Sequence, residues 1–146
     1  MITEKRPSIL RVLQMDYWAF LAAIFPFVFW GFYLYDRFAV KSESQNLLYG
    51  ALIVTGISLA VFAWRYLSIL SFYGGGVETQ ATVNRVGFFR DRGSIAYIYT
   101  FEGQKYLCQN TVMKTGRTKS YRIGEEITVL VDRNNPKRAI IRDLYV

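Results

Sequence analysis

The stretch SFYGGGVETQATV, residues 71–83, divides the chain into two parts of different character. Before it lie two long apolar segments, 17–35 and 47–64, and after it come short alternating strands separated by polar turns. The first part is typical of a membrane anchor and the second of a small β domain. We expect the three glycines at 74–76 to form a hinge between the two parts, because glycine restricts the backbone least.

The composition limits the chemistry that the chain can perform. Its 146 residues include no histidine and a single cysteine, Cys108. The lack of histidine excludes Ser-His-Asp and Cys-His catalysis and every histidine metal site, so we expect no catalytic residues, no metal and no cofactor. The formal net charge is +7, most of it after residue 74. A basic excess is compatible with nucleic acid or with an anionic membrane surface as partner. We favour the membrane surface, because many cytoplasmic domains of membrane proteins are basic for that reason.

The segment YWAFLAAIFPFVFWGFYLY, residues 17–35, carries no charge and is bracketed by Asp16 and Asp36. As a helix it would be about 28 Å long, close to the hydrocarbon thickness of a bilayer. Pro26 stands in the middle, where a proline usually kinks a helix. The alternative is a cleaved signal peptide, but the run is long and aromatic and no small-x-small cleavage site follows it. We therefore predict an uncleaved transmembrane helix.

The second apolar segment raises the question of where Arg65 lies. If the span ends near Trp64, it is about 27 Å long and Arg65 lies at the membrane interface, in contact with lipid or a partner. A span that continued to Tyr73 would bury Arg65, at roughly 2.5–3.5 kcal/mol on insertion scales. We prefer the first arrangement, in which residues 66–73 form a short apolar neck that continues as a juxtamembrane helix or lies along the headgroups. The alternative is that Arg65 pairs inside a helix bundle with an acidic residue of a partner.

The short connection between the two segments predicts an antiparallel hairpin with both chain ends on the same side of the membrane. Lys and Arg are more frequent in the tail (Lys5, Arg6, Arg11) and after residue 65 than in the connection. The positive-inside rule therefore predicts a two-pass protein of the cell or inner membrane with both termini in the cytoplasm. Candidate helix-packing positions are two small-xxx-small pairs, Ala19 with Ala23 and Gly56 with Ala60.

The remainder of the chain predicts β structure. Residues 77–83 alternate between apolar and polar side chains, as in a half-buried strand. Further strand-like segments follow, separated by turn-forming residues such as Glu102-Gly103, and they cover residues 95–101, 105–112, 127–131 and 138–142. Five short strands in one small domain predict an antiparallel barrel or sandwich of the OB or SH3-like kind. We divide the chain into a cytoplasmic tail (1–16), a transmembrane hairpin with its neck (17–73) and a soluble β domain (77–146).

Several turn and strand positions form a pattern that resembles a known family. The pattern consists of Gly76 before the first strand, Tyr97-x-Tyr99-x-Phe101, Gly103, Tyr121-x-x-Gly124, Ile127-x-Val129, and Asp132 followed by Asn135-Pro136. It resembles bacterial domain-of-unknown-function family 3592, whose members carry a small β domain beside one or two transmembrane helices. The family usually has tyrosine or a similar residue where this chain has Val131. The resemblance implies a fold and a topology, and it brings no catalytic residues.

The segment MKTGRTKSYR, residues 113–122, contains four basic residues and no acid, namely Lys114, Arg117, Lys119 and Arg122. Each could contribute about 1 kcal/mol at an anionic headgroup layer. They could equally contact an acidic partner or form a solvated loop, while RNA is disfavoured because few aromatic residues are interleaved. Glu125 and Glu126 should point to opposite faces of a strand, and Cys108 should be a structural residue.

These features favour a non-enzymatic, membrane-anchored accessory or scaffold subunit. It would contact lipids and another membrane protein, or a second copy of itself, and present the basic β domain to a partner. The alternative is a module that binds an anionic lipid or ligand through residues 114–122. An enzyme is disfavoured because no suitable set of side chains is present, and a channel would require oligomerisation.

Overall fold

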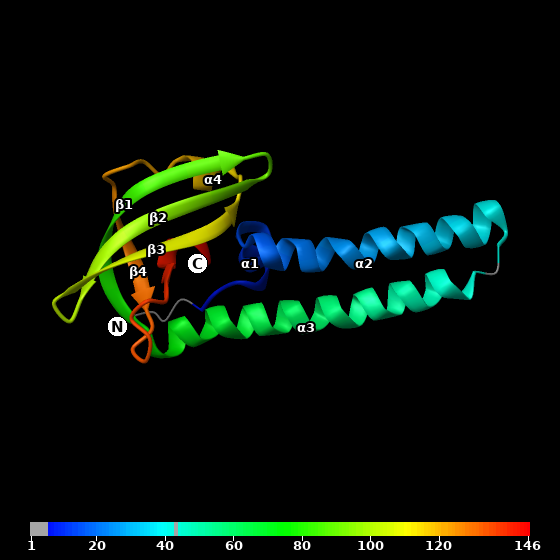
Figure 1. Ribbon diagram of the computed structural model, residues 1–146, viewed down its shortest axis with the longest axis horizontal. Coiled ribbons are helices and arrows are strands. Elements are labelled where there is room, and N and C mark those ends of the chain that lie inside the picture. Colours follow the sequence, from blue (N-terminus) through cyan, green and yellow to red (C-terminus); the bar gives the residue numbers. More distant parts are fainter. Residues whose placement is uncertain (1–5, 43) are drawn as a thin grey trace.

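Residues 6–42 and 44–146 are described by a computed structural model, in which two long helices carry a small β domain at one end (Figure 1). Lys5, which we assigned to the tail, lies outside the described residues. The elements are α1 (Ile9–Met15), α2 (Tyr17–Tyr35), a π-helical turn (Asp36–Val40), α3 (Gln45–Gly75), β1 (Val77–Phe89), β2 (Arg92–Phe101), β3 (Gln104–Met113), α4 (Gly116–Lys119), β4 (Glu126–Val131), β5 (Ala139–Ile141) and a 3-10 turn (Arg142–Leu144). This architecture confirms the predicted fold class.

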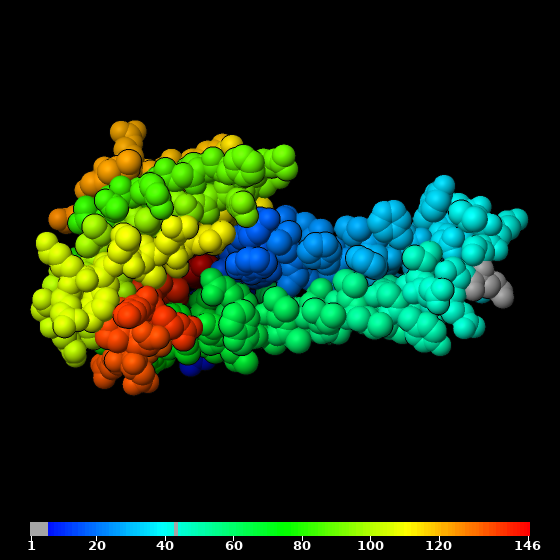
Figure 2. Space-filling model, viewed as in Figure 1, coloured from blue at the N-terminus to red at the C-terminus, as the bar shows by residue number. Residues whose placement is uncertain are grey.

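The two helices pack against each other as an antiparallel hairpin. Residues Tyr17–Val40 and Gln45–Gly75 are each long and apolar enough to cross a membrane, by length and composition. Halfway along, the indole nitrogen of Trp30 donates a hydrogen bond of 3.0 Å to the Thr55 hydroxyl. Many large side chains of the hairpin face outward, including Phe27 at 79% exposure. The hairpin projects from the β domain as a narrow paired rod (Figure 2).

The strands form one antiparallel sheet in the order β3-β2-β1-β4-β5. β1 lies at the centre: its first half pairs with β4 and its second half with β2, and the register shifts between Val83 and Arg85. A bulge of this kind bends a strand and increases its twist. It also breaks the alternation of side chains, which explains why the predicted strand 77–83 is six residues shorter than β1.

A side chain, Asn110, joins the two edge strands where the barrel closes. Its amide oxygen accepts a hydrogen bond from the Ile141 backbone N–H at 3.1 Å, and its amide nitrogen donates to the Ala139 carbonyl at 3.4 Å. The hydroxyl of Tyr97 lies 2.9 Å from the same amide oxygen and 2.8 Å from the Ala139 carbonyl. β3 and β5 are thus connected through buried polar groups, and each group has a hydrogen-bonding partner.

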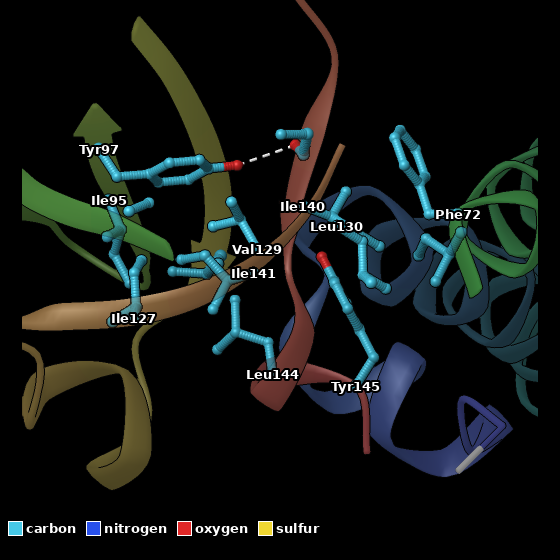
Figure 3. Close-up of a cluster of buried hydrophobic side chains, with 14 of the residues drawn as sticks. Phe72, Ile95, Tyr97, Ile127, Val129, Leu130, Ile140, Ile141, Leu144 and Tyr145 are labelled. Carbon is cyan, nitrogen blue, oxygen red and sulfur yellow. Dashed lines mark hydrogen bonds between the residues drawn. The ribbon is translucent and has the colours of Figure 1, made fainter. Parts of the chain in front are cut away.

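The core of the barrel extends into the helices. Figure 3 shows Phe72 of α3 and Tyr145 beside Leu130 and Ile140, which come from the strands. Val12 of α1 is completely buried in the same cluster, as is Ile69 of α3. Because these residues exclude water from one face of the barrel, the helices form part of its hydrophobic core.

The course of α3 agrees with one of our predictions and differs from another. The helix continues through residues 66–73 to Gly75, so the predicted neck is a continuation of the helix. The glycine run is not a hinge: two of its glycines are helical, and the Gly76 N–H bonds to the Phe72 carbonyl at 2.9 Å. A Cβ at Gly76 would collide with that carbonyl oxygen. Gly76 therefore permits a close approach of backbone segments, and burial of Ile69 and Phe72 explains why the helix extends so far.

We predict that Asn110→Ala will lower the free energy of unfolding by about 2–3 kcal/mol, because it leaves the buried Ile141 N–H without an acceptor. Thermal unfolding of the full chain in detergent measures this. Gln109→Ala, at an exposed neighbouring position on the same strand, is the matched control and should change stability little. Equal effects of the two substitutions would contradict the role of Asn110 in closing the barrel.

Candidate interaction site

Asp16 occupies the point where α1, α2 and the barrel meet. Its side chain is completely buried, and one carboxylate oxygen accepts a hydrogen bond of 3.0 Å from the Ala19 N–H. Asp16 is therefore the N-cap of α2, which satisfies a backbone donor at the helix start. Its backbone also forms a β-bridge with Val112 of β3. The residue thus fixes the start of α2 against an edge of the sheet.

The second carboxylate oxygen of Asp16 binds Arg65. The guanidinium of Arg65 donates two hydrogen bonds to it, at 2.8 Å from Nε and 2.6 Å from Nη2. The hydroxyl of Tyr145 lies 3.4 Å from the same oxygen. Burial raises the pKa of Tyr145, and the nearby Asp16 carboxylate raises it further. Tyr145 therefore stays protonated and can donate its proton to the carboxylate.

This network gives Arg65 a partner within its own chain. We expected it to contact lipid or a partner at the interface, or to pair with an acid inside a bundle, but did not consider Asp16 as that acid. The side chain of Arg65 keeps 21% of its surface exposed. Sequence reasoning placed both residues at the end of a span, and antiparallel helices bring such ends together. That was the signal that could have revealed the pair.

A cleft of about 530 Å³ lies beside this network, between the base of the helices and the open side of the barrel. Its helical wall contains Trp18, Trp64 and Arg65, and its barrel wall contains Lys137 and Arg138 beside polar residues of β3. Trp18 and Trp64 are 56% and 67% exposed. Figure 2 shows the hollow where the helices and the barrel meet. Tryptophan and cations around one cleft are typical of a site at a membrane–water interface.

The four basic residues predicted as a contact surface are all exposed, but they do not form an extended loop. Gly116–Lys119 forms the short helix α4, which is capped by Thr115. The Lys114 N–H bonds to the Asp91 carbonyl in the turn between β1 and β2 at 2.9 Å. The carboxylate of Glu125 accepts a hydrogen bond of 2.8 Å from the backbone N–H of Arg122. The segment is therefore ordered by its own hydrogen bonds.

The two predicted small-residue pairs lie in different surroundings. Ala19 is buried in the core cluster, and Ala23 lines an apolar groove of about 330 Å³ between α2 and α3. Gly56 and Ala60 are exposed on the outer face of α3. The first pair therefore packs within the chain, while the second pair is exposed on the surface of the hairpin.

The remaining candidates for a chemical site are the acidic side chains and Cys108. Among residues 6–42 and 44–146, no group of three His, Cys, Asp or Glu side chains could hold a metal. Cys108 is half-buried, and its thiol lies 3.6 Å from the Ala139 carbonyl at the barrel seam. This position agrees with a structural role for the thiol.

Residues 75–144 match the model of a family described as Domain of unknown function (DUF3592). The β domain belongs to this family. The match confirms the resemblance that we inferred from the turn and strand residues. No curated protein and no solved structure matches the chain. In this DUF3592 domain, Tyr97 and Tyr99 point into the core, and Gly103 and Gly124 take positive φ angles, so these pattern residues are structural.

We predict that Arg65→Gln will destabilise the full chain by about 3–5 kcal/mol, because it leaves the buried Asp16 carboxylate without a countercharge. In the double variant Asp16→Asn/Arg65→Gln, the cost should be smaller than the sum of the single costs by more than about 1 kcal/mol. Asparagine retains the helix cap, so the cycle isolates the ion pair. Unfolding of the full chain in mixed micelles measures all four species.

The matched control for this cycle is Arg142→Gln. Arg142 forms a partly exposed ion pair with Glu78 at 3.2 Å, and loss of such a pair should cost less than about 1 kcal/mol. If Arg65→Gln costs no more than Arg142→Gln, the buried pair does not connect the helices to the barrel as described.

Proposed function

We propose that the protein is a non-enzymatic accessory subunit of the cell membrane, anchored by α2 and α3, that holds its DUF3592 domain at a fixed position above the cytoplasmic surface. The observation that supports this proposal is the continuous core between helices and barrel, with the Asp16–Arg65 pair at its edge. A barrel on a flexible linker would sample many orientations. A barrel built onto the ends of two membrane helices instead presents the same face at the same height, as a docking subunit requires.

The partner is another membrane protein or a second copy of this chain. Two surfaces of the hairpin suit a partner's helix: the groove at Ala23 and the outer face at Gly56 and Ala60. Small residues allow helices to approach closely, and apolar helices gain van der Waals contact when they do. We propose the outer face of α3 as the main contact, because Gly56 and Ala60 are both exposed there, one helical turn apart, and form a small-xxx-small pair.

Purification of the full chain in mild detergent should yield a stoichiometric partner or a homo-oligomer. The double variant Gly56→Leu/Ala60→Leu should lose this association but keep its thermal stability. Gly31→Leu, a similar enlargement on α2 where a Cβ also has open space, should keep the association. A monomer without a partner in the unmodified chain would contradict the proposal.

A second candidate function is recognition of an anionic lipid, and the cleft between the helices and the barrel favours it. Lys137 and Arg138 are exposed at its rim. The guanidinium of Arg138 lies over the Phe72 ring and donates a hydrogen bond of 3.1 Å to the Ser68 hydroxyl. The carboxylate of Asp132 lies 3.8 Å from the same guanidinium. A lipid phosphate could contact both cations while its acyl chains lie along the helices beside Trp18 and Trp64. This site differs from the segment 114–122 that we first considered for lipid binding.

Titration of the full chain in neutral detergent with phosphatidylglycerol and with phosphatidylcholine tests this function. We predict thermal stabilisation by the anionic lipid alone, and its loss in Lys137→Gln/Arg138→Gln. Lys119→Gln/Arg122→Gln removes the same charge at a distance and should retain the effect. The opposite pattern would move the site to residues 114–122, and no lipid preference in the unmodified chain would refute this second function.

A further inference from the structure

The turn between β1 and β2 extends well beyond the body of the barrel. Beyond the bulge, β1 pairs only with β2, out to Phe89 opposite Arg92. In Figure 1 this hairpin reaches along α1 toward the first turns of α2. The turn and α2 line one hollow, with Phe89, Arg90 and Arg92 on one side and Tyr17, Phe20 and Leu21 on the other. The tip therefore lies beside the first residues of the proposed membrane span.

The side chains at this tip suit the boundary between headgroups and acyl chains. Phe89 is 63% exposed. The guanidiniums of Arg90 and Arg92 lie 5.4 and 5.9 Å from the centre of its ring. Such arginines can cover an apolar ring and still direct their charge to phosphate groups. Leu21 lies four residues inside α2, about 6 Å along the helix axis from Tyr17, so Phe89 reaches the depth at which interfacial aromatic rings are found.

The tip is held firmly, and its composition differs from that of the opposite end of the barrel. The Lys114 N–H bonds to the Asp91 carbonyl at 2.9 Å, which ties the turn to the end of β3. Arg90 has φ 54°, a conformation that favours glycine or asparagine, yet the position carries a cation. At the far end of the barrel, residues 101–105 around the turn between β2 and β3 have one acid and one base, Glu102 and Lys105, whereas residues 88–92 have two arginines and one acid, Asp91. The end that faces the helices therefore carries the excess of basic charge.

We propose that the β1–β2 tip, residues 88–92, inserts Phe89 into the headgroup layer of an anionic membrane and forms a third membrane contact beside α2 and α3. Arg90 and Arg92 bind lipid phosphates on either side of the ring. This inference rests on the proposed membrane anchoring, but not on the partner or on the lipid in the cleft. It also explains why β1 is so long, since a shorter strand would not bring the turn to the membrane.

Depth measurements on the full chain in liposomes test the inference. Single cysteines at Phe89→Cys, Ile57→Cys and Glu102→Cys, each in a Cys108→Ser background, carry a nitroxide label. Collision rates with oxygen and with a water-soluble nickel chelate report the depth of each label. Ile57 is an outward-facing residue of α3 and serves as the lipid reference, while Glu102 serves as the water reference.

The expected result is a nickel collision rate at position 89 several-fold lower than at 102, with oxygen favoured as at position 57. The difference should be larger in phosphatidylglycerol-containing vesicles than in phosphatidylcholine, and Arg90→Gln/Arg92→Gln should remove that dependence on lipid charge. If position 89 is as accessible to nickel as 102 while 57 is in lipid, tip insertion is refuted and the anchoring stands. If position 57 is also accessible to nickel, the proposed anchoring itself fails, and the inference with it.

Discussion

The Asp16 carboxylate is the point on which the arrangement of helices and barrel depends. It begins α2 by capping the first turn, and it binds the guanidinium that α3 brings back at Arg65. Its backbone joins an edge of the sheet at Val112. A buried carboxylate is unfavourable unless it is paired and hydrogen-bonded. The chain therefore gains stability only when both helix ends and the C-terminal Tyr145 occupy their places together, and this couples the hairpin to the barrel.

The same requirement explains the side of the barrel on which the helices lie. β3 and β5 are the edges of the sheet, and Asn110 joins them only through its side chain. Exposed edges favour association with other strands. Here Asp16, α1 and the base of α3 cover the region beside the seam, and what remains open is the cleft lined by Trp18, Trp64 and Arg138. The candidate site is thus the part of the barrel opening that the helices leave uncovered.

The sequence predicted the elements better than their connections. Charge-free length placed α2 at 17–35, and alternation with turn residues located the strands to within a few residues, apart from the length of β1. The burial of Arg65 against Asp16 was not predicted, because the cost of a buried arginine depends on whether an acid lies nearby in space, and we did not combine the two span ends that the hairpin brings together. The glycine run was misread for a similar reason. Glycine occurs both at flexible joints and where two backbone segments come close together. Only the packing of Ile69 and Phe72 distinguishes the two cases here.

With the Asp16–Arg65 pair intact, the barrel and the hairpin should move as one body. Double electron–electron resonance between nitroxide labels at Tyr49→Cys, near the far end of the hairpin, and Glu102→Cys, at the far end of the barrel, tests this directly in the Cys108→Ser background. Both positions are exposed. We predict a single narrow distance distribution in lipid bilayers, which broadens when Arg65→Gln is introduced. A broad distance distribution in the chain that retains Arg65 would show that residues 74–76 act as a hinge, and would contradict the rigid connection between hairpin and barrel.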